Sequence, residues 1–251
     1  MNRPRLAIAG LTACSGCQLT LLNCEEELAE VAARFDLVSF PMAESVEGGA
    51  PFDAAIVEGA VSTPGDLANL FRLRNSSRLL VALGTCAIFG GVAAMNNGVS
   101  TREELVAAVY GDGEKTVESF APAPLTNFVS VDFSITGCPP EKQEVMALLC
   151  ALLNGTLPPL ATYPVCTECR SRENLCLLLE RKELCLGPII QGGCNARCPA
   201  TGIVCEGCRG PVREANVAQE LELLLERGFG RKEIERRMSR FKPEWDYGQR
   251  R

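Results

Sequence analysis

The cysteines of this chain limit its possible folds and chemistry more than any other feature. There are fourteen among 251 residues, and there is no histidine. Twelve form a dispersed group of four and a crowded group of eight: Cys14, Cys17, Cys86 and Cys138, then Cys166, Cys169, Cys176, Cys185, Cys194, Cys198, Cys205 and Cys208. Sets of four thiolates are the ligands of cubane iron–sulfur clusters, so the pattern indicates several clusters in one chain. Because the commonest acid–base side chain is missing, we expect this chain to move electrons rather than make bonds.

The composition is typical of a folded protein that binds neither nucleic acid nor a membrane. Its 251 residues are enough for one sizeable domain and a smaller one, and the 47% of hydrophobic residues is enough for a core without disulfides. The net charge of −6 argues against nucleic-acid binding, which normally needs a basic surface. No apolar run reaches the ~20 residues that cross a bilayer, so we expect no membrane span.

Residues 1–14 have two interpretations. A basic start at Arg3 and Arg5, an apolar run and the sequence Leu-Thr-Ala before Cys14 resemble a lipoprotein signal, which would make the chain an exported, disulfide-rich domain. However, Arg5–Gly10 also reads as a buried parallel strand that the following domain needs. We therefore expect a cytoplasmic protein, because in a reducing compartment clustered cysteines are metal ligands rather than disulfides.

Residues 1–155 alternate short aliphatic runs with helical patterns, which predicts an α/β domain with helices on both faces of a parallel sheet. Strands are expected at Arg5–Gly10, Asp36–Phe40, Ala54–Glu58, Leu79–Leu83 and Phe128–Asp132. Helices are expected at Gln18–Arg34, Pro64–Arg74, Arg102–Tyr110 and Glu141–Leu153. Cys24 and Cys150 fit apolar helical stripes, so we expect both in the core.

The dispersed cysteines all follow expected strands. Cys14 and Cys17 come after the first strand, Cys86 after the fourth and Cys138 after the fifth, while Glu58 ends the third. Ligands of parallel sheets collect beyond the carboxyl ends of the strands, so we expect these side chains to meet at one edge.

After residue 155 the chain changes character. Asn154–Pro164 reads as a linker, and the domains that follow are a small cysteine-rich domain at 156–212 and a helical segment at 213–251, with helices expected at Glu214–Arg227 and Lys232–Phe241. Few residues separate the crowded cysteines, so we expect metal coordination to replace a hydrophobic core. Five basic residues of the last segment form either a solvated helix face or a docking surface: Arg231, Lys232, Arg236, Arg237 and Arg240.

A zinc-stabilised interaction module without redox activity is the alternative for the crowded group. Cys166-x2-Cys169 and Cys205-x2-Cys208 have the spacing of one four-thiolate zinc site. That arrangement leaves four crowded cysteines without a role unless a second zinc binds, and it does not account for the dispersed group.

Taken together, the motifs resemble a known family. Cys14-Ser-Gly-Cys17, Glu58-Gly59, Gly84-Thr-Cys86-Ala and Gly137-Cys138-Pro-Pro are similar to the motifs of the flavodoxin-like domain in [NiFe] hydrogenase small subunits. The later motifs resemble the cytoplasmic, cofactor-coupled branch, above all the delta subunits of NAD(P)-linked sulfhydrogenases: Cys176-Leu-Leu-Leu-Glu-Arg-Lys-Glu-Leu-Cys185-Leu-Gly-Pro and Cys194-Asn-Ala-Arg-Cys198-Pro.

The resemblance implies three [4Fe–4S] clusters and their ligands. The proximal cluster would be held by Cys14, Cys17, Cys86 and Cys138, the medial cluster by Cys194, Cys198, Cys205 and Cys208, and the distal cluster by Cys166, Cys169, Cys176 and Cys185. Cys166 stands where membrane-bound and periplasmic relatives carry a histidine, and Cys198 adds a ligand where those relatives hold a three-iron cluster. Ligation by thiolates alone lowers the reduction potential, which suits exchange between hydrogen and a nicotinamide.

The resemblance also implies partners. A large subunit would hold the nickel–iron centre, and flavin- and NAD(P)-binding and ferredoxin-like subunits would exchange the electrons. The chain lacks the paired Cys-x2-Cys motifs with an adjacent histidine that bind nickel, so we expect no catalytic residue in it. Glu58 is expected either to hydrogen-bond across the large-subunit interface or assist proton exit, or to be simply a polar strand end.

Overall fold

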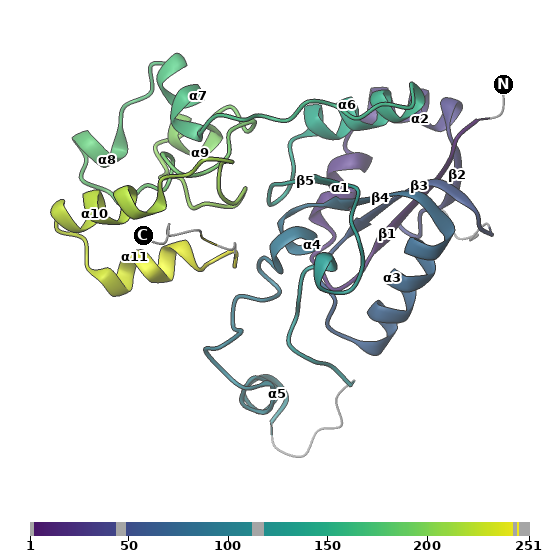
Figure 1. Ribbon diagram of the computed structural model, residues 1–251, viewed down its shortest axis with the longest axis horizontal. Coiled ribbons are helices and arrows are strands. Elements are labelled where there is room, and N and C mark those ends of the chain that lie inside the picture. Colours follow the sequence, from purple (N-terminus) through teal and green to yellow (C-terminus); the bar gives the residue numbers. More distant parts are fainter. Residues whose placement is uncertain (1–2, 44–48, 112–117, 243–244, 246–251) are drawn as a thin grey trace.

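The computed structural model describes residues 3–43, 49–111, 118–242 and 245, and it has two parts (Figure 1). One part is built around a sheet, and the other contains the crowded cysteines and the last two helices. Residues 154–164, expected as a linker, run between the two parts without helix or strand.

A five-stranded parallel sheet in the order β2-β1-β3-β4-β5 confirms the predicted α/β class. The strands are β1 (Arg5–Gly10), β2 (Asp36–Ser39), β3 (Phe52–Glu58), β4 (Ser77–Leu83) and β5 (Phe133–Ile135). The residues before Cys14 therefore include a central strand, which pairs with β2 on one side and β3 on the other.

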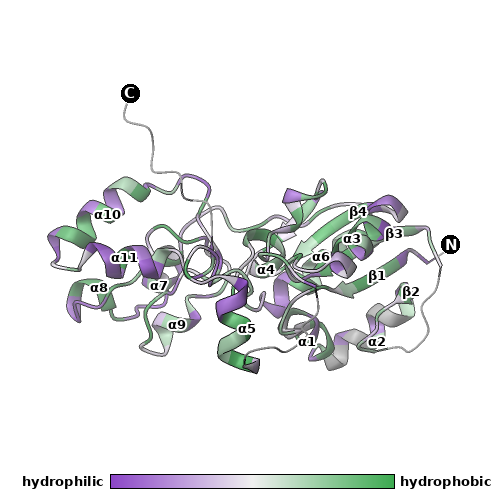
Figure 2. Cartoon of the chain, turned by 90° about the horizontal axis from the view of Figure 1, so that it is seen from below, coloured by the Kyte–Doolittle hydropathy of each residue, from purple (hydrophilic) through white to green (hydrophobic). Residues whose placement is uncertain are grey.

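Helices cover both faces of the sheet. They are α1 (Gly16–Leu22), α2 (Glu25–Arg34), α3 (Pro64–Ser76), α4 (Thr85–Phe89) and α6 (Lys142–Leu153), with one 3-10 turn, η1 (Leu125–Asn127). Helix α5 (Arg102–Tyr110) lies away from the sheet and has no buried residue (Figure 1). Alternate residues of β1 enter two separate cores: Leu6 lies in the core that includes Leu148 of α6, and Ala7 in the core that includes Leu70 of α3. Burial on both faces explains why the strands read as continuous apolar runs, green in Figure 2.

Two elements predicted in the sheet part have other bounds in the structure. The fifth strand is at Phe133–Ile135 rather than at Phe128–Asp132. The Asp132 carboxylate accepts a hydrogen bond from the Leu80 amide at 2.7 Å, so strand pairing with β4 begins only after it. The helix expected at Gln18–Arg34 is divided into α1 and α2, because the chain turns at Asn23 and Cys24.

The second part has a hydrophobic core of its own, contrary to the prediction that metal coordination would replace one. Its helices are α7 (Val165–Ser171), α8 (Leu177–Glu180), α9 (Arg197–Ala200), α10 (Val217–Glu226) and α11 (Arg231–Met238). Helices α10 and α11 supply many of the apolar side chains of this core. Leu224 of α10 and Ile234 of α11 are fully buried and lie in one cluster with Leu186. The core is thus completed by residues outside the cysteine-rich segment.

Candidate iron–sulfur sites

The structure brings the four dispersed cysteines to the carboxyl edge of the sheet. Cys14 lies in the turn after β1, Cys17 in the first turn of α1, Cys86 in the first turn of α4 and Cys138 between β5 and α6. Cys14 and Cys86 lie close enough to Cys138 that their charges raise the pKa of its thiol. Cys138 likewise raises the pKa of the Cys17 thiol. Parallel strands end at a common edge, so residues far apart in sequence form one set of thiols.

Glycine leaves the room this set requires. A Cβ atom on Gly84, whose φ is +83°, would lie 2.3 Å from the Cys17 Sγ atom, and one on Gly91 would lie 2.8 Å from the Cys86 Sγ atom. Gly137 has a different reason to be glycine, because its Cβ would meet the backbone of Pro139 and Pro140 at 2.7 Å. A side chain at Gly84 or Gly91 would thus displace a thiol.

Glu58 supports this edge from inside the chain. It is 1% exposed, and its carboxylate accepts hydrogen bonds from the backbone amides of Cys17 at 3.1 Å and Gln18 at 3.0 Å, and from the Gln18 side chain at 3.1 Å. The residue before α1, Ser15, makes no side-chain cap, so Glu58 caps that helix from β3 instead. Sequence reasoning missed this capping role, because the two segments are 40 residues apart.

Four of the crowded cysteines line one cavity. Its volume is about 690 Å³, and its walls include Cys166, Cys169, Cys176 and Cys185 together with leucines 177, 178, 179 and 223. A Cβ atom on Gly187 would lie 3.1 Å from the Cys166 Sγ atom and 3.6 Å from the Cys185 Sγ atom. A wide, mostly apolar space ringed by four thiols fits an inorganic cluster with thiolate ligands.

The other four crowded cysteines are neighbours of one another. Cys194 lies just before α9, and Cys198 lies within it. Both are close enough to Cys208 that their charges raise the pKa of its thiol. Cys208 in turn raises the pKa of the Cys205 thiol. Burial raises the pKa of the Cys208 thiol to about 11, and burial raises that of Cys166 in the first cavity to about 12. Metal binding at either set must therefore release protons.

Hydrogen bonds connect the three sets of cysteines in space, one set to the next. The Cys205 amide donates to the sulfur of Cys185 at 3.3 Å. The Thr85 hydroxyl, beside Cys86, donates to the Cys208 carbonyl. The set at 194–208 therefore contacts the sheet-edge set on one side and the set at 166–185 on the other.

Arg209 fastens this junction. It is 2% exposed and binds both carboxylate oxygens of Glu144 in α6, at 2.6 and 2.8 Å. It also donates to the carbonyls of Gly192 at 2.8 Å and Thr136 at 3.2 Å, two residues before Cys194 and Cys138 respectively. One buried guanidinium thus holds loops from both parts of the chain, which the sequence alone did not reveal.

A compact site for a single metal ion is not present in the part of the chain that the structure describes. Among the described residues, no three cysteine or carboxylate side chains converge closely enough to hold one metal ion. The three sets supply thiol groups, which are the ligands that iron–sulfur clusters use.

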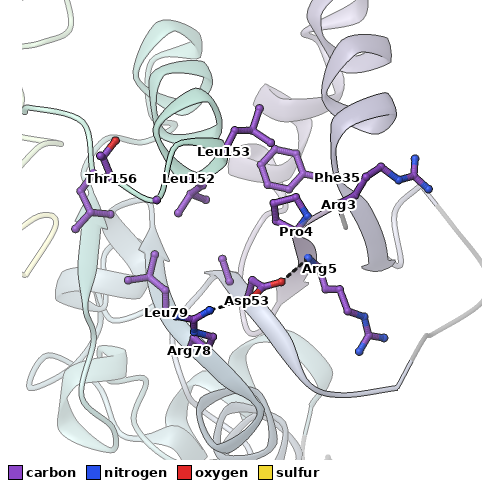
Figure 3. Close-up of a pocket in the computed structure, with 13 residues that line it drawn as sticks. Arg3, Pro4, Arg5, Phe35, Asp53, Arg78, Leu79, Leu152, Leu153 and Thr156 are labelled. Atoms are coloured by element: carbon purple, nitrogen blue, oxygen red, sulfur yellow. Dashed lines mark hydrogen bonds and ion pairs between the residues drawn. The ribbon is translucent and has the colours of Figure 1, made fainter. Parts of the chain in front are cut away.

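The remaining candidates lie elsewhere. Cys24 is fully buried, as predicted, but Cys150 is exposed, because it lies on the outer side of α6. Of the basic residues in the last segment, Arg237 and Arg240 form ion pairs with Glu206 rather than a free solvated face. A cavity of about 930 Å³ near the opposite edge of the sheet is lined by arginines 3, 5 and 78 and contains no cysteine (Figure 3).

Comparison with known proteins identifies the class. The family model of the NADH ubiquinone oxidoreductase 20 kDa subunit matches residues 14–152, which hold the sheet-edge cysteines. The sulfhydrogenase 2 delta subunit of Pyrococcus furiosus is 41% identical, over 88% of this chain and 92% of its own. One subunit of the F420-non-reducing hydrogenase vhu from Methanocaldococcus jannaschii is 33% identical, over 82% and 81% of the two chains.

A solved structure agrees with this match. A chain in the H2-reduced NAD+-reducing [NiFe]-hydrogenase superposes with a TM-score of 0.56 and 28% identity, covering 63% of this chain and 95% of its own. The chain therefore belongs to the small subunits of [NiFe] hydrogenases, in the delta-type group of cofactor-coupled enzymes. It is an iron–sulfur subunit of an oxidoreductase that acts on hydrogen and forms a complex with a large subunit. Within the described ranges, no helix is long and apolar enough to cross a membrane.

Proposed function

We propose that this chain carries electrons between the nickel–iron site of the large subunit and a flavin- and NAD(P)-binding partner, through three [4Fe–4S] clusters. The proximal ligands are Cys14, Cys17, Cys86 and Cys138, the medial ligands Cys194, Cys198, Cys205 and Cys208, and the distal ligands Cys166, Cys169, Cys176 and Cys185. Each bound cluster would accept and release one electron at a time.

The observation that carries this proposal is the pair of hydrogen bonds between the sets. The hydroxyl of Thr85, beside the proximal ligand Cys86, donates to the carbonyl of the medial Cys208, and the amide of the medial Cys205 donates to the sulfur of the distal Cys185. These contacts support the order proximal, medial, distal. Amide donors also stabilise the more negative, reduced state of the sulfur they contact.

The ends of this path also support the proposal. Cys14 and Cys138 are exposed at the sheet edge, so a large subunit that covers them would bring its metal close to the proximal set. At the other end, Leu179 lines the distal cavity and is 54% exposed, so it is available to a second partner. The relative named NAD-reducing hydrogenase HoxS subunit delta, from Cupriavidus necator, supports a nicotinamide as the final carrier.

The proposal is tested by removing one ligand at each end of the path. Cys138→Ala leaves three thiolates at the sheet edge, so we expect weaker assembly with the large subunit and loss of hydrogen-driven reduction of NAD(P) or artificial dyes. Cys169→Ala should leave assembly and hydrogen–deuterium exchange at the nickel site intact while it blocks electron exit. The matched control is Cys150→Ala, at an exposed cysteine outside all three sets.

The two variants must differ for the order to hold. Equal loss of assembly in both, or full electron output in both, would contradict the assignment of Cys138 to the start of the path and Cys169 to its end.

A further inference from the structure

The loop that brings Cys194 and Cys198 to the medial set has an unusual backbone. Gly193, Asn195 and Ala196 all have positive φ angles, of 104°, 55° and 48°. Asn195 and Ala196 bear a steric cost for this conformation, which glycine avoids, and Ala196 is fully buried. Such a backbone persists only where its surroundings hold it in place.

Glu168 holds it. One carboxylate oxygen accepts a hydrogen bond from the Gly193 amide at 2.6 Å, and the other accepts one from the Ala196 amide at 3.0 Å. The Tyr163 hydroxyl donates to the first oxygen at 3.3 Å, and the Cys194 thiol lies 3.9 Å from the second. Two amides of this left-handed turn, three residues apart, thus bind one carboxylate, and Glu168 supplies the negative charge there.

By its position in the chain, Glu168 belongs with the proposed distal cysteines rather than with the medial ones. It lies in α7 between Cys166 and Cys169, two of the proposed distal ligands. Its carboxylate nevertheless accepts hydrogen bonds from the medial loop, at the amides of Gly193 and Ala196 on either side of Cys194. One side chain therefore joins the distal helix to the loop of a medial ligand.

We propose that Glu168 is a positioning residue that fixes the medial cluster beside the distal one and lowers its reduction potential. The inference rests on the proposed assignment of ligands to three clusters. A fixed negative charge near Cys194 disfavours an added electron.

The test uses the whole hydrogenase complex, purified without oxygen. Glu168→Gln removes the charge but keeps one acceptor oxygen, whereas Glu168→Ala removes both acceptors. The matched control is Glu183→Gln, at an exposed glutamate of the same cysteine-rich part. Electron paramagnetic resonance during a potentiometric titration measures each cluster, with signals assigned by the ligand variants Cys198→Ser for the medial site and Cys169→Ser for the distal site.

We expect Glu168→Gln to keep the iron content and to shift only the medial midpoint potential upward. Glu168→Ala should lose the medial signal and about four iron atoms, one cluster, while it keeps the distal signal. An unchanged medial potential in a fully loaded Glu168→Gln complex would overturn the proposal. So would loss of the distal rather than the medial signal in Glu168→Ala. A wild-type complex without three cluster signals from this subunit would instead refute the ligand assignment itself, before any variant is compared.

Discussion

Two buried glutamates of this chain are accommodated in very different ways. Glu58 accepts three hydrogen bonds from Cys17 and Gln18. Glu220 in α10 is 5% exposed, and within the described part of the chain its Oε1 atom has no hydrogen-bond partner. Burial therefore raises the pKa of Glu220 to about 7.

We expect Glu220→Gln to stabilise the chain in a pH-dependent way. The folded-state pKa lies above the ordinary value of 4.5, so the protonated form favours folding; this contribution is complete below pH 4.5 and is lost as the pH rises through about 7. Above that pH the buried carboxylate costs at most roughly 3 kcal/mol. Thermal unfolding should therefore show a higher Tm near pH 8 and almost no change near pH 5. Glu222→Gln, at an exposed position of the same helix, is the control, and an equal rise at both pH values would contradict the explanation.

A second prediction at this scale concerns Cys198, the proposed fourth medial ligand. Cys198→Ser should convert the medial site toward a three-iron form or shift its potential, while the fold is kept, because a serine oxygen is a poorer ligand for iron than a thiolate. Electron paramagnetic resonance of the oxidised protein measures this. Cys24→Ala, at a buried cysteine outside all three sets, should leave every cluster signal intact. An unchanged medial signal in Cys198→Ser would remove Cys198 from the ligand set.

At the scale of elements, apolar patterning was a good guide to burial and a poorer one to geometry. Four strands and the helices starting at Pro64 and Arg102 were predicted well, because alternating burial and the caps at Thr63 and Thr101 are local signals. The segment before β5 was misread: Val131 packs on the core from an irregular stretch. The sequence around Asp132 could not indicate that its carboxylate accepts a hydrogen bond from the amide of Leu80, a residue far away in the chain.

The contact between the two parts of the chain depends on Arg209, and this yields a stability prediction. Arg209→Ala leaves the mostly buried carboxylate of Glu144 without its partner, so we expect the free energy of unfolding to fall by about 3 kcal/mol. Arg34→Ala, which breaks an exposed pair with Glu30, should cost less than about 0.5 kcal/mol. Urea unfolding under anaerobic conditions measures both variants. Similar losses in the two would show that the buried pair does not hold the parts together.

At the scale of the whole molecule, three hydrophobic cores, one on each face of the sheet and one in the cysteine-rich part, support three sets of thiols. The sheet-edge set could be predicted from the sequence, because parallel strands end at a common edge. The division of the eight crowded cysteines came from resemblance and not from spacing. Cys185 and Cys205 are 20 residues apart, yet the Cys205 amide bonds the Cys185 sulfur, and this contact depends on a core that α10 and α11 complete. Glu58, Glu168 and Arg209 were missed as supporting residues for the same reason, since their partners are distant in sequence.

The number and type of clusters is the central claim, and metal analysis tests it most directly. Anaerobically purified chain should contain about twelve iron and about twelve acid-labile sulfide, as three four-iron clusters require. About eleven iron with the signal of an oxidised three-iron cluster would contradict the medial assignment alone. Stoichiometric zinc with negligible iron would contradict the entire account.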